Sequence, residues 1–336
     1  MAEKYYTAAT GNWSAAANWD GGVKPGPGDD VHANGNTVTI DEDITVLSLR
    51  TTAGATAVAG GGFTVSTART INATGTGVLA GTTSCLTSTA TSGTTVTVNA
   101  DVTGGGTAGA RGLVNNSTGT VALVGDVSGG TAATSYGVNN ASTGITTITG
   151  NVTGGSGNSS AYGVNNASTG TVTITGDVTG GSAGHGYNNG GLTLNGNATG
   201  GSAANVQGVN LAAGTATING NVIGGSHAQA EGVNLTTGTL TVNGDLIPAV
   251  GNAVGWTAGS GNNGKLILNG NIQSVATGVM AIGTTGGRMV IKPTTPLTHA
   301  YRTDDAGGIG SERTLSTGAA GGGGAGARGY HNSLVT

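Results

Sequence analysis

Apolar residues alternate with threonine in short runs, and the same run returns along most of the chain. One copy reads Thr-Val-Thr-Ile-Thr-Gly-Asp-Val-Thr-Gly-Gly-Ser at residues 171–182. Alternation over about four to eight residues predicts a half-buried β-strand. The Asp or Asn of the run recurs at spacings of 20 to 26 residues, at Asp101, Asp126, Asn151, Asp177, Asn197, Asn221, Asp245 and Asn271. An internal repeat of that length indicates a stacked repeat architecture.

Each copy carries apolar residues at the same three offsets, i, i+2 and i+6, whatever the length of its loops. The triplets are Val96/Val98/Val102, Val121/Leu123/Val127, Thr146/Ile148/Val152, Val172/Ile174/Val178, Leu192/Leu194/Ala198, Ala216/Ile218/Val222, Leu240/Val242/Leu246 and Leu266/Leu268/Ile272. Thr146 departs from the apolar pattern. We expect these side chains to point inward and to stack from one repeat to the next.

A third short element completes each repeat. It reads Gly-Leu-Val-Asn-Asn at 112–116, Gly-Val-Asn-Asn at 137–140 and 163–166, and Gly-Val-Asn-Leu at 208–211 and 232–235. Three short strands in about 24 residues predict an all-β fold, a right-handed parallel β-helix, whereas a propeller blade needs about 40 residues and four strands. The Gly density and the β-branched residues argue against helices.

Two kinds of repeated position predict how the coils stack. Asn at one recurring turn position is expected to form amide ladders along the axis, through Asn115, Asn139, Asn165, Asn210 and Asn234. Gly-Gly pairs are expected at the corners, at 104–105, 129–130, 154–155, 180–181, 200–201 and 224–225.

Composition supports this reading and excludes several classes. Glycine makes up 69 of the 336 residues, without the Gly-X-Y period of collagen, and the regular apolar runs argue against disorder. Charged residues make up 8%, and residues 71–264 hold one basic residue, Arg111, and five acidic ones. The net charge is −3 over residues 1–70 and +3 over 265–336. No basic stripe of a nucleic-acid-binding protein is present.

The chain carries no recognisable export or membrane signal. Its start, Met-Ala-Glu-Lys-Tyr-Tyr, lacks the basic and apolar regions of a signal peptide. No segment has the ~18 consecutive apolar residues that a membrane helix needs. Cys85 is the single cysteine, which excludes an internal disulfide and predicts an inert core residue. A surface-type composition without an export signal fits a virion protein, made in the host cytoplasm and released by lysis.

Residues 11–50 differ from the repeat, with two Trp-containing turns around Trp13 and Trp19, a Pro-Gly-Asp-Asp turn and a first strand. This segment resembles the opening module of many bacterial and phage β-helix surface proteins. The resemblance covers roughly 40 residues and implies a capped β-helix. We expect both Trp side chains to plug the end of the core, because open solenoid ends aggregate. Stacking on a glycan is the alternative.

Three segments follow from these patterns: an N-terminal cap with first strands over 1–62, the solenoid over 63–287, and a closing element with a Gly-rich tail over 288–336. The basic C-terminal segment is expected to dock against a partner such as a capsid shell. Its candidate assembly contacts are Arg302, Arg313, Arg328 and Tyr330.

The search for catalytic and metal-binding residues favours a protein that is not an enzyme and holds no cofactor. Glycoside hydrolysis needs two carboxylates in a cleft, whereas the solenoid aspartates share one repeat position with Asn, which indicates a turn role. The five histidines are scattered, without metal-ligand spacing. Asp29-Asp30 and Asp41-Glu42-Asp43 read as solvated turns, with a Ca²⁺ site as the alternative. A broken Thr-x-Thr array leaves ice binding as another alternative.

The sequence therefore predicts a structural protein of a bacteriophage virion, a capsid decoration protein or head fibre. It would bind other virion proteins, the major capsid protein above all, through one end. We expect a homo-oligomer, with three copies as the guess, and neither nucleic acid nor membrane as a partner. The alternatives are a tail fibre or tailspike that binds a host glycan, and a bacterial surface adhesin.

Overall fold

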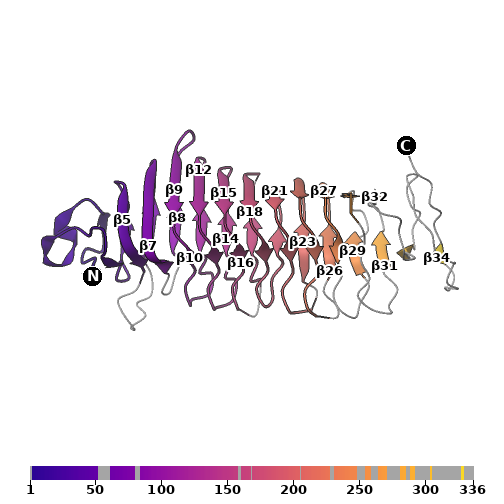
Figure 1. The fold of residues 1–336 in the computed structure, drawn as a ribbon, viewed down its shortest axis with the longest axis horizontal. Coiled ribbons are helices and arrows are strands. Elements are labelled where there is room, and N and C mark those ends of the chain that lie inside the picture. The colour runs from indigo at the N-terminus through magenta and orange to yellow at the C-terminus, as the bar shows by residue number, and fades with distance from the viewer. Residues whose placement is uncertain are drawn as a thin grey trace.

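The computed structural model describes residues 2–51, 61–79, 84–157, 160–167, 169–204, 206–227, 231–247, 254–258, 264–270, 281–284, 288–291, 303–304 and 327–328. The described chain forms a parallel β-solenoid of about 9 turns with repeats of about 25 residues, and it is 3% helical. Figure 1 shows the coils following one another along the long axis, from the indigo N-terminal end to the orange β29. The predicted all-β, parallel β-helix fold is confirmed.

Each coil contributes one short strand to each of three faces, and strands of one face pair in parallel with the same strand of the next coil. The first face consists of β9 (Thr95–Asn99), β12 (Thr120–Val124), β15 (Ile145–Thr149), β18 (Thr171–Thr175), β21 (Gly191–Asn195), β24 (Thr215–Ile218), β27 (Thr239–Val242), β30 (Lys265–Leu268) and β32 (Arg288–Ile291). The second consists of β10 (Val102–Thr103), β13 (Val127–Ser128), β16 (Val152–Thr153), β19 (Val178–Thr179), β22 (Ala198–Thr199), β25 (Val222–Ile223) and β28 (Leu246–Ile247). The third consists of β8 (Leu86–Ser88), β11 (Leu113–Asn115), β14 (Val138–Asn140), β17 (Val164–Asn166), β20 (Tyr187–Asn188), β23 (Gln207–Leu211), β26 (Glu231–Leu235), β29 (Val254–Ala258) and β31 (Ala281–Thr284).

The N-terminal segment joins the same stack. Its elements are β1 (Glu3–Tyr5), β2 (Thr10–Asn12), the 3₁₀ turns η1 (Ala16–Asn18) and η2 (Asp20–Gly22), β3 (Asp30–His32), β4 (Thr37–Thr39), β5 (Ile44–Arg50), β6 (Gly62–Val65) and β7 (Arg69–Leu79). β5 pairs with β7 and β7 with β9, while β4 pairs with β6 and β6 with β8, all in parallel. At the other end, β32 pairs with β30, also in parallel. Strand pairing thus crosses both predicted segment boundaries. The short β33 (Thr303–Asp304) and β34 (Ala327–Arg328) pair antiparallel with each other.

The predicted apolar triplets form the core. All of their members that the structure describes are buried, and each pairs in register with its counterpart one coil away, as Val121, Thr146 and Val172 do. Ile272 lies outside the described residues. Thr146 is fully buried, and its hydroxyl accepts a hydrogen bond of 2.9 Å from the Asn115 amide. A buried hydroxyl needs such a partner, so this departure from the apolar pattern is compensated within the core.

Asn115 belongs to an interior row that the sequence did not reveal. It pairs with Asn140, which pairs with Asn166, and all three side chains are fully buried. The Asn140 amide donates to the Asn166 side-chain oxygen at 3.0 Å. Two coils after Asn166 the interior position is taken by Leu211, and one coil later by Leu235. Asn140 and Asn166 are therefore joined amide to amide, Asn115 donates to Thr146 instead, and leucine fills the same place farther along the row.

The predicted outer amide ladder forms with a different membership. Asn165 donates to Asn139 at 2.8 Å, Asn188 to Asn165 at 2.8 Å and Asn210 to Asn188 at 2.7 Å. Assigning Asn115 to this row was wrong, because Asn139 pairs with Val114 and the Asn115 side chain points inward. Asn188 was missed. The ladder residues lie in strands of the third face, as the third short element predicted, and not at a turn position.

The Gly-Gly pairs lie where the chain leaves the second face, as predicted, and close packing explains why glycine is required. A Cβ atom on Gly181 would lie 1.7 Å from the carbonyl oxygen of Gly155, one coil earlier. The corresponding distances are 1.7 Å for Gly201 and 1.8 Å for Gly225. Real Cβ atoms never approach an oxygen so closely, so backbone lies directly on backbone along this corner.

We expect Gly181→Ala to lower the free energy of unfolding by about 2 kcal/mol or more, because the added methyl group overpacks a contact between two backbones. Urea unfolding followed by circular dichroism measures the change. Gly26→Ala is the matched control, since a Cβ at Gly26 meets nothing within 4 Å, and its effect should stay within about 0.5 kcal/mol. Equal stability of the two variants would contradict the close-packed corner.

Candidate functional site

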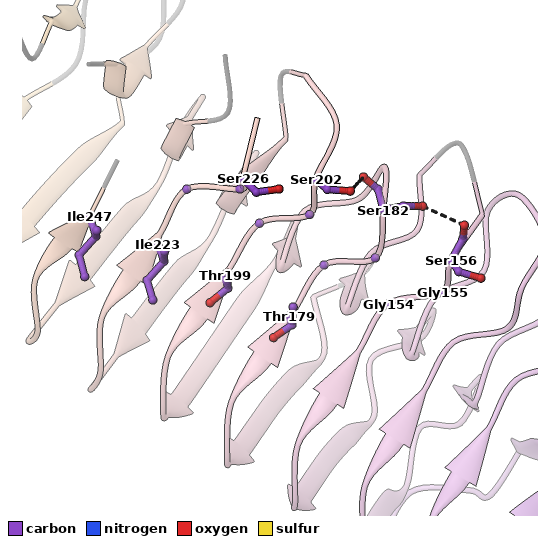
Figure 2. Close-up of a pocket in the computed structure, with 16 residues that line it drawn as sticks. Gly154, Gly155, Ser156, Thr179, Ser182, Thr199, Ser202, Ile223, Ser226 and Ile247 are labelled. Atoms are coloured by element: carbon purple, nitrogen blue, oxygen red, sulfur yellow. Dashed lines mark hydrogen bonds between the residues drawn. The ribbon is translucent and has the colours of Figure 1, made fainter. Parts of the chain in front are cut away.

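A groove of about 570 Å³ runs along the Gly-Gly corner and crosses several coils. Figure 2 shows its two walls: Ser156, Ser182, Ser202 and Ser226 follow one side, and Thr179, Thr199, Ile223 and Ile247 the other. The glycines form the floor between them. No lining residue carries a charge. The same tetrapeptide pattern, Thr or Ile followed by Gly-Gly-Ser, builds each step of the groove as far as Ser226, so its chemistry repeats once per coil. Ile247, which is followed by proline, lies at its end.

Most hydrogen-bonding groups along this groove are already occupied. The Ser182 hydroxyl donates to the carbonyl oxygen of Ser156 at 2.8 Å, and the Ser202 hydroxyl donates to that of Ser182 at 3.3 Å. The backbone N–H groups of Gly181 and Gly201 donate to carbonyl oxygens in the loops that follow the corner, at 2.7 and 3.0 Å. An extended peptide cannot add to these donors as a further strand. What the groove presents is threonine hydroxyls, isoleucine methyl groups and glycine Cα–H groups.

A column of planar side chains lies at the start of the third face. The rings of Tyr136 and Tyr162 stack at 5.1 Å with an interplanar angle of 6°, and Tyr162 and His185 stack at 5.0 Å and 14°. The Arg111 guanidinium lies over the Tyr136 ring at 5.3 Å. All four side chains are half-buried. Because their faces cover one another, the column presents ring edges to a ligand.

The column ends on a hydrogen bond that fixes the state of His185. Its Nδ1 accepts from the backbone N–H of Gln207 at 3.0 Å, so the ring is neutral with the proton on Nε2. Burial lowers the pKa of His185 from 6.5 to about 4. Burial also raises the pKa of Tyr136. The column therefore carries a single charge at neutral pH, that of Arg111.

The repeated Asp or Asn position has the turn role that the sequence predicts. The side-chain oxygen of Asp101 accepts from the backbone N–H of Asp126 at 2.8 Å, and that of Asp126 accepts from Asn151 at 2.7 Å. The same bond recurs in the next four coils, where the side-chain oxygens of Asn151, Asp177, Asn197 and Asn221 each accept from the backbone N–H one coil later. Asp and Asn serve equally, because each needs only one acceptor oxygen. These carboxylates hold adjacent coils in register.

The N-terminal acidic side chains likewise form hydrogen bonds or ion pairs within the chain. Asp41 accepts from the backbone and the hydroxyl of Ser14 at 2.9 and 2.6 Å, and Asp43 accepts from the backbone of Thr70 at 2.8 Å. Glu42 forms an ion pair with Lys24 at 2.5 Å. No cluster of three or more potential metal ligands occurs among the described residues.

Trp13 and Trp19 are 1% and 2% exposed and pack edge-to-face at 4.8 Å. The Trp19 indole donates to the Trp13 carbonyl oxygen at 2.8 Å, and Tyr6 packs on Trp19 at 4.9 Å. Neither Trp face is open to a sugar. Cys85 is fully buried, and burial raises the pKa of its thiol.

The remaining sequence-predicted positions divide in two. Arg302, Arg313 and Tyr330 lie outside the described residues, and of Arg328 the structure gives only its backbone pairing with Thr303. The Thr array of the first face is in register over Thr147, Thr173, Thr193, Thr217 and Thr241. Ala122 and Ile267 continue this row, and Ile145 and Gly191 interrupt its neighbour. The array is therefore regular over five coils and broken beyond them.

Sequence reasoning missed both the groove and the aromatic column. The groove had a signal, the Thr-Gly-Gly-Ser phrase, which was read as a corner alone. The column consists of the residue that precedes the glycine of the third element, and this residue differs in every coil except two. Comparison of the chain with protein-family models, curated proteins and solved structures finds no match. In the described part of the chain, no helix has the length and hydropathy of a membrane span.

We expect the stability of the protein to fall as the pH drops from 6.5 towards 4. In this window the unfolded chain binds a proton at His185 that the folded chain excludes, so the contribution of the neutral ring is complete above pH 6.5 and is lost below it. His185→Gln should reduce the free energy of unfolding that is lost between pH 6.5 and pH 4 by about 2–3 kcal/mol. Gln207 already occupies this column one coil later, which makes glutamine a fitting replacement.

Urea unfolding of the wild type and the variant at several pH values measures the difference. The carboxylates titrate in both proteins, so only the difference between the two profiles counts. Parallel profiles would contradict a neutral, buried His185.

Proposed function

We propose that this protein is a structural component of a bacteriophage particle, a capsid decoration protein or head fibre that projects from the shell as a rod. The observation that carries the proposal is where the polar side chains of the coils are directed. The Asp/Asn ladder, the two Asn rows and the Ser row all bond to the neighbouring coil. The polar side chains of these rows therefore stabilise a long, uniform scaffold.

The surface supports the same role. A rod that lacks charge over most of its length resists non-specific binding, and interlocked coils without long described loops offer few sites for proteolysis. Its partners would be other virion proteins, the major capsid protein first among them. The place of synthesis would be the host cytoplasm, and the protein would act in the virion.

A non-enzymatic role agrees with the carboxylates. Every solenoid aspartate that the structure describes occupies the ladder position. The Oδ1 atom at this position accepts a backbone hydrogen bond in six coils, at Asp101, Asp126, Asn151, Asp177, Asn197 and Asn221. A catalytic acid needs an environment that differs from its neighbours. The ladder gives all of its members the same environment.

Cryo-electron microscopy of purified particles tests the virion role by copy number and position. We expect many copies at symmetry-related sites on the capsid, each a rod with about 9 turns. A few copies at the tail would favour a receptor-binding fibre instead. Absence from particles together with display on bacterial cells would replace the proposal with an adhesin.

Glycan binding is the second candidate, and the groove favours it. Its lining is uncharged, its hydroxyls repeat once per coil, and its apolar Cα–H and methyl groups suit the C–H faces of sugar rings. A linear neutral glycan, which also repeats along its length, matches such a lining. Thr179 and Thr199 would hydrogen-bond to it from the wall opposite the serine row.

We expect Thr179→Val and Thr199→Val each to weaken the binding of a neutral polysaccharide by about fivefold, because each removes one hydrogen bond worth about 1 kcal/mol. Binding is measured by calorimetry against a panel of host polysaccharides. Thr217→Val is the control, since Thr217 lies on the first face and outside the groove. No binding by the wild type to any neutral polymer would dismiss this candidate.

A further inference from the structure

The column of Arg111, Tyr136, Tyr162 and His185 has the composition of a protein contact. Tyr and Arg dominate the residues that contribute most to binding at protein interfaces. Here two tyrosines and an arginine gather on three successive coils of a rod whose other described surfaces are rich in Thr, Asn, Ser and Gly. Stacking already restrains their side chains, so a partner that binds them immobilises little further.

Arg111 is the charged member of this column, and no described carboxylate pairs with it. It is the single basic residue between positions 71 and 264. Among the described residues, ion pairs connect Lys24 with Glu42 and Arg50 with Asp30, and no carboxylate lies within ion-pair distance of Arg111. Its Nε is buried and has no hydrogen-bond partner. The buried Nε is out of reach from outside, but the terminal nitrogens are not among the buried atoms. A half-buried guanidinium without a carboxylate in its own copy can donate from them to a carboxylate of a partner.

The chain itself carries carboxylates at the same height along the rod. Asp101 and Asp126 begin the coil that contains Arg111 and the coil that follows it, and both are exposed. They lie at the turn between the first and second faces, whereas Arg111 lies at the start of the third face, so they do not meet within one copy. In two rods placed side by side and pointing the same way, each coil lies level with its own copy.

We propose that copies of this chain associate side by side in parallel, with the Arg111 column of one copy against the Asp101 and Asp126 turns of the next. Charge complementarity at equal height selects this arrangement. An antiparallel pair would place Arg111 level with distant coils. The two contacting surfaces differ, so the interface is heterologous and closes into a ring when the rotation permits. This inference does not depend on the virion role, because purified protein displays it without particles.

Sedimentation velocity and light scattering on the full chain test the association. The wild type should give a mass that is a multiple of 31.9 kDa. Arg111→Glu should weaken the association at least about tenfold, since it removes one partner of a desolvated pair and places like charges together. The double variant D101N/D126N should weaken it similarly while it keeps the fold, because Asn serves the ladder at Asn151, Asn197 and Asn221.

Asp177→Asn is the matched control. Asp177 occupies the same exposed ladder position, but the column residue of its own coil is the neutral His185. It should leave the association unchanged. A monomeric wild type, or an equal effect of Asp177→Asn and D101N/D126N, would overturn the proposal.

Cysteine pairs test the orientation independently. A mixture of Tyr162→Cys and Asn151→Cys chains, which keep Arg111, Asp101 and Asp126, should form a disulfide between copies, whereas Tyr162→Cys mixed with Asp245→Cys should not. The native Cys85 is fully buried and does not interfere. Cross-linking of the second mixture in preference to the first would show an antiparallel or staggered contact and would contradict the parallel one.

Discussion

The whole structure depends on how closely one coil lies on the next along the glycine corner. At Gly181 and Gly201 the backbone of one coil rests on the carbonyl oxygen of the coil before it, with no room for a methyl group. This contact restricts the register of the stack, because a slip that brought Ser182 or Ser202 to this place would put a Cβ against that oxygen. Side chains elsewhere in the coil are then presented at a constant spacing of about 4.8 Å, the distance between paired strands.

A constant spacing turns single polar residues into rows. An amide that meets its own kind one coil away both donates and accepts, as Asn165 does between Asn139 and Asn188. The same spacing stacks the rings of Tyr136 and Tyr162. Planar and amide groups stabilise such rows, whereas like charges one coil apart would repel each other. The low charge of the coils follows from this repulsion. Asp101 and Asp126 are tolerated because they are exposed to water.

Sequence reasoning succeeded where the period of two is strict. The apolar triplets place Val96, Val172 and Leu240 in the core without further information, because each strand buries alternate residues. The third element was harder, since its Asn-Asn doublet fits two registers that differ by one residue. Asn115 fell on the wrong one, because Leu113-Val114 inserts an extra apolar residue before the first Asn.

The candidate contacts were beyond sequence reasoning for a related reason. Loop lengths vary between coils, so the residues that stack as one column have no fixed spacing in the chain, and Arg111, Tyr136 and His185 share no residue type. The column is defined by the glycine that follows each of them, which the register then aligns. Arg111 is the one Lys or Arg between residues 71 and 264, so in the proposed association its carboxylate partner determines which surface of the rod is covered.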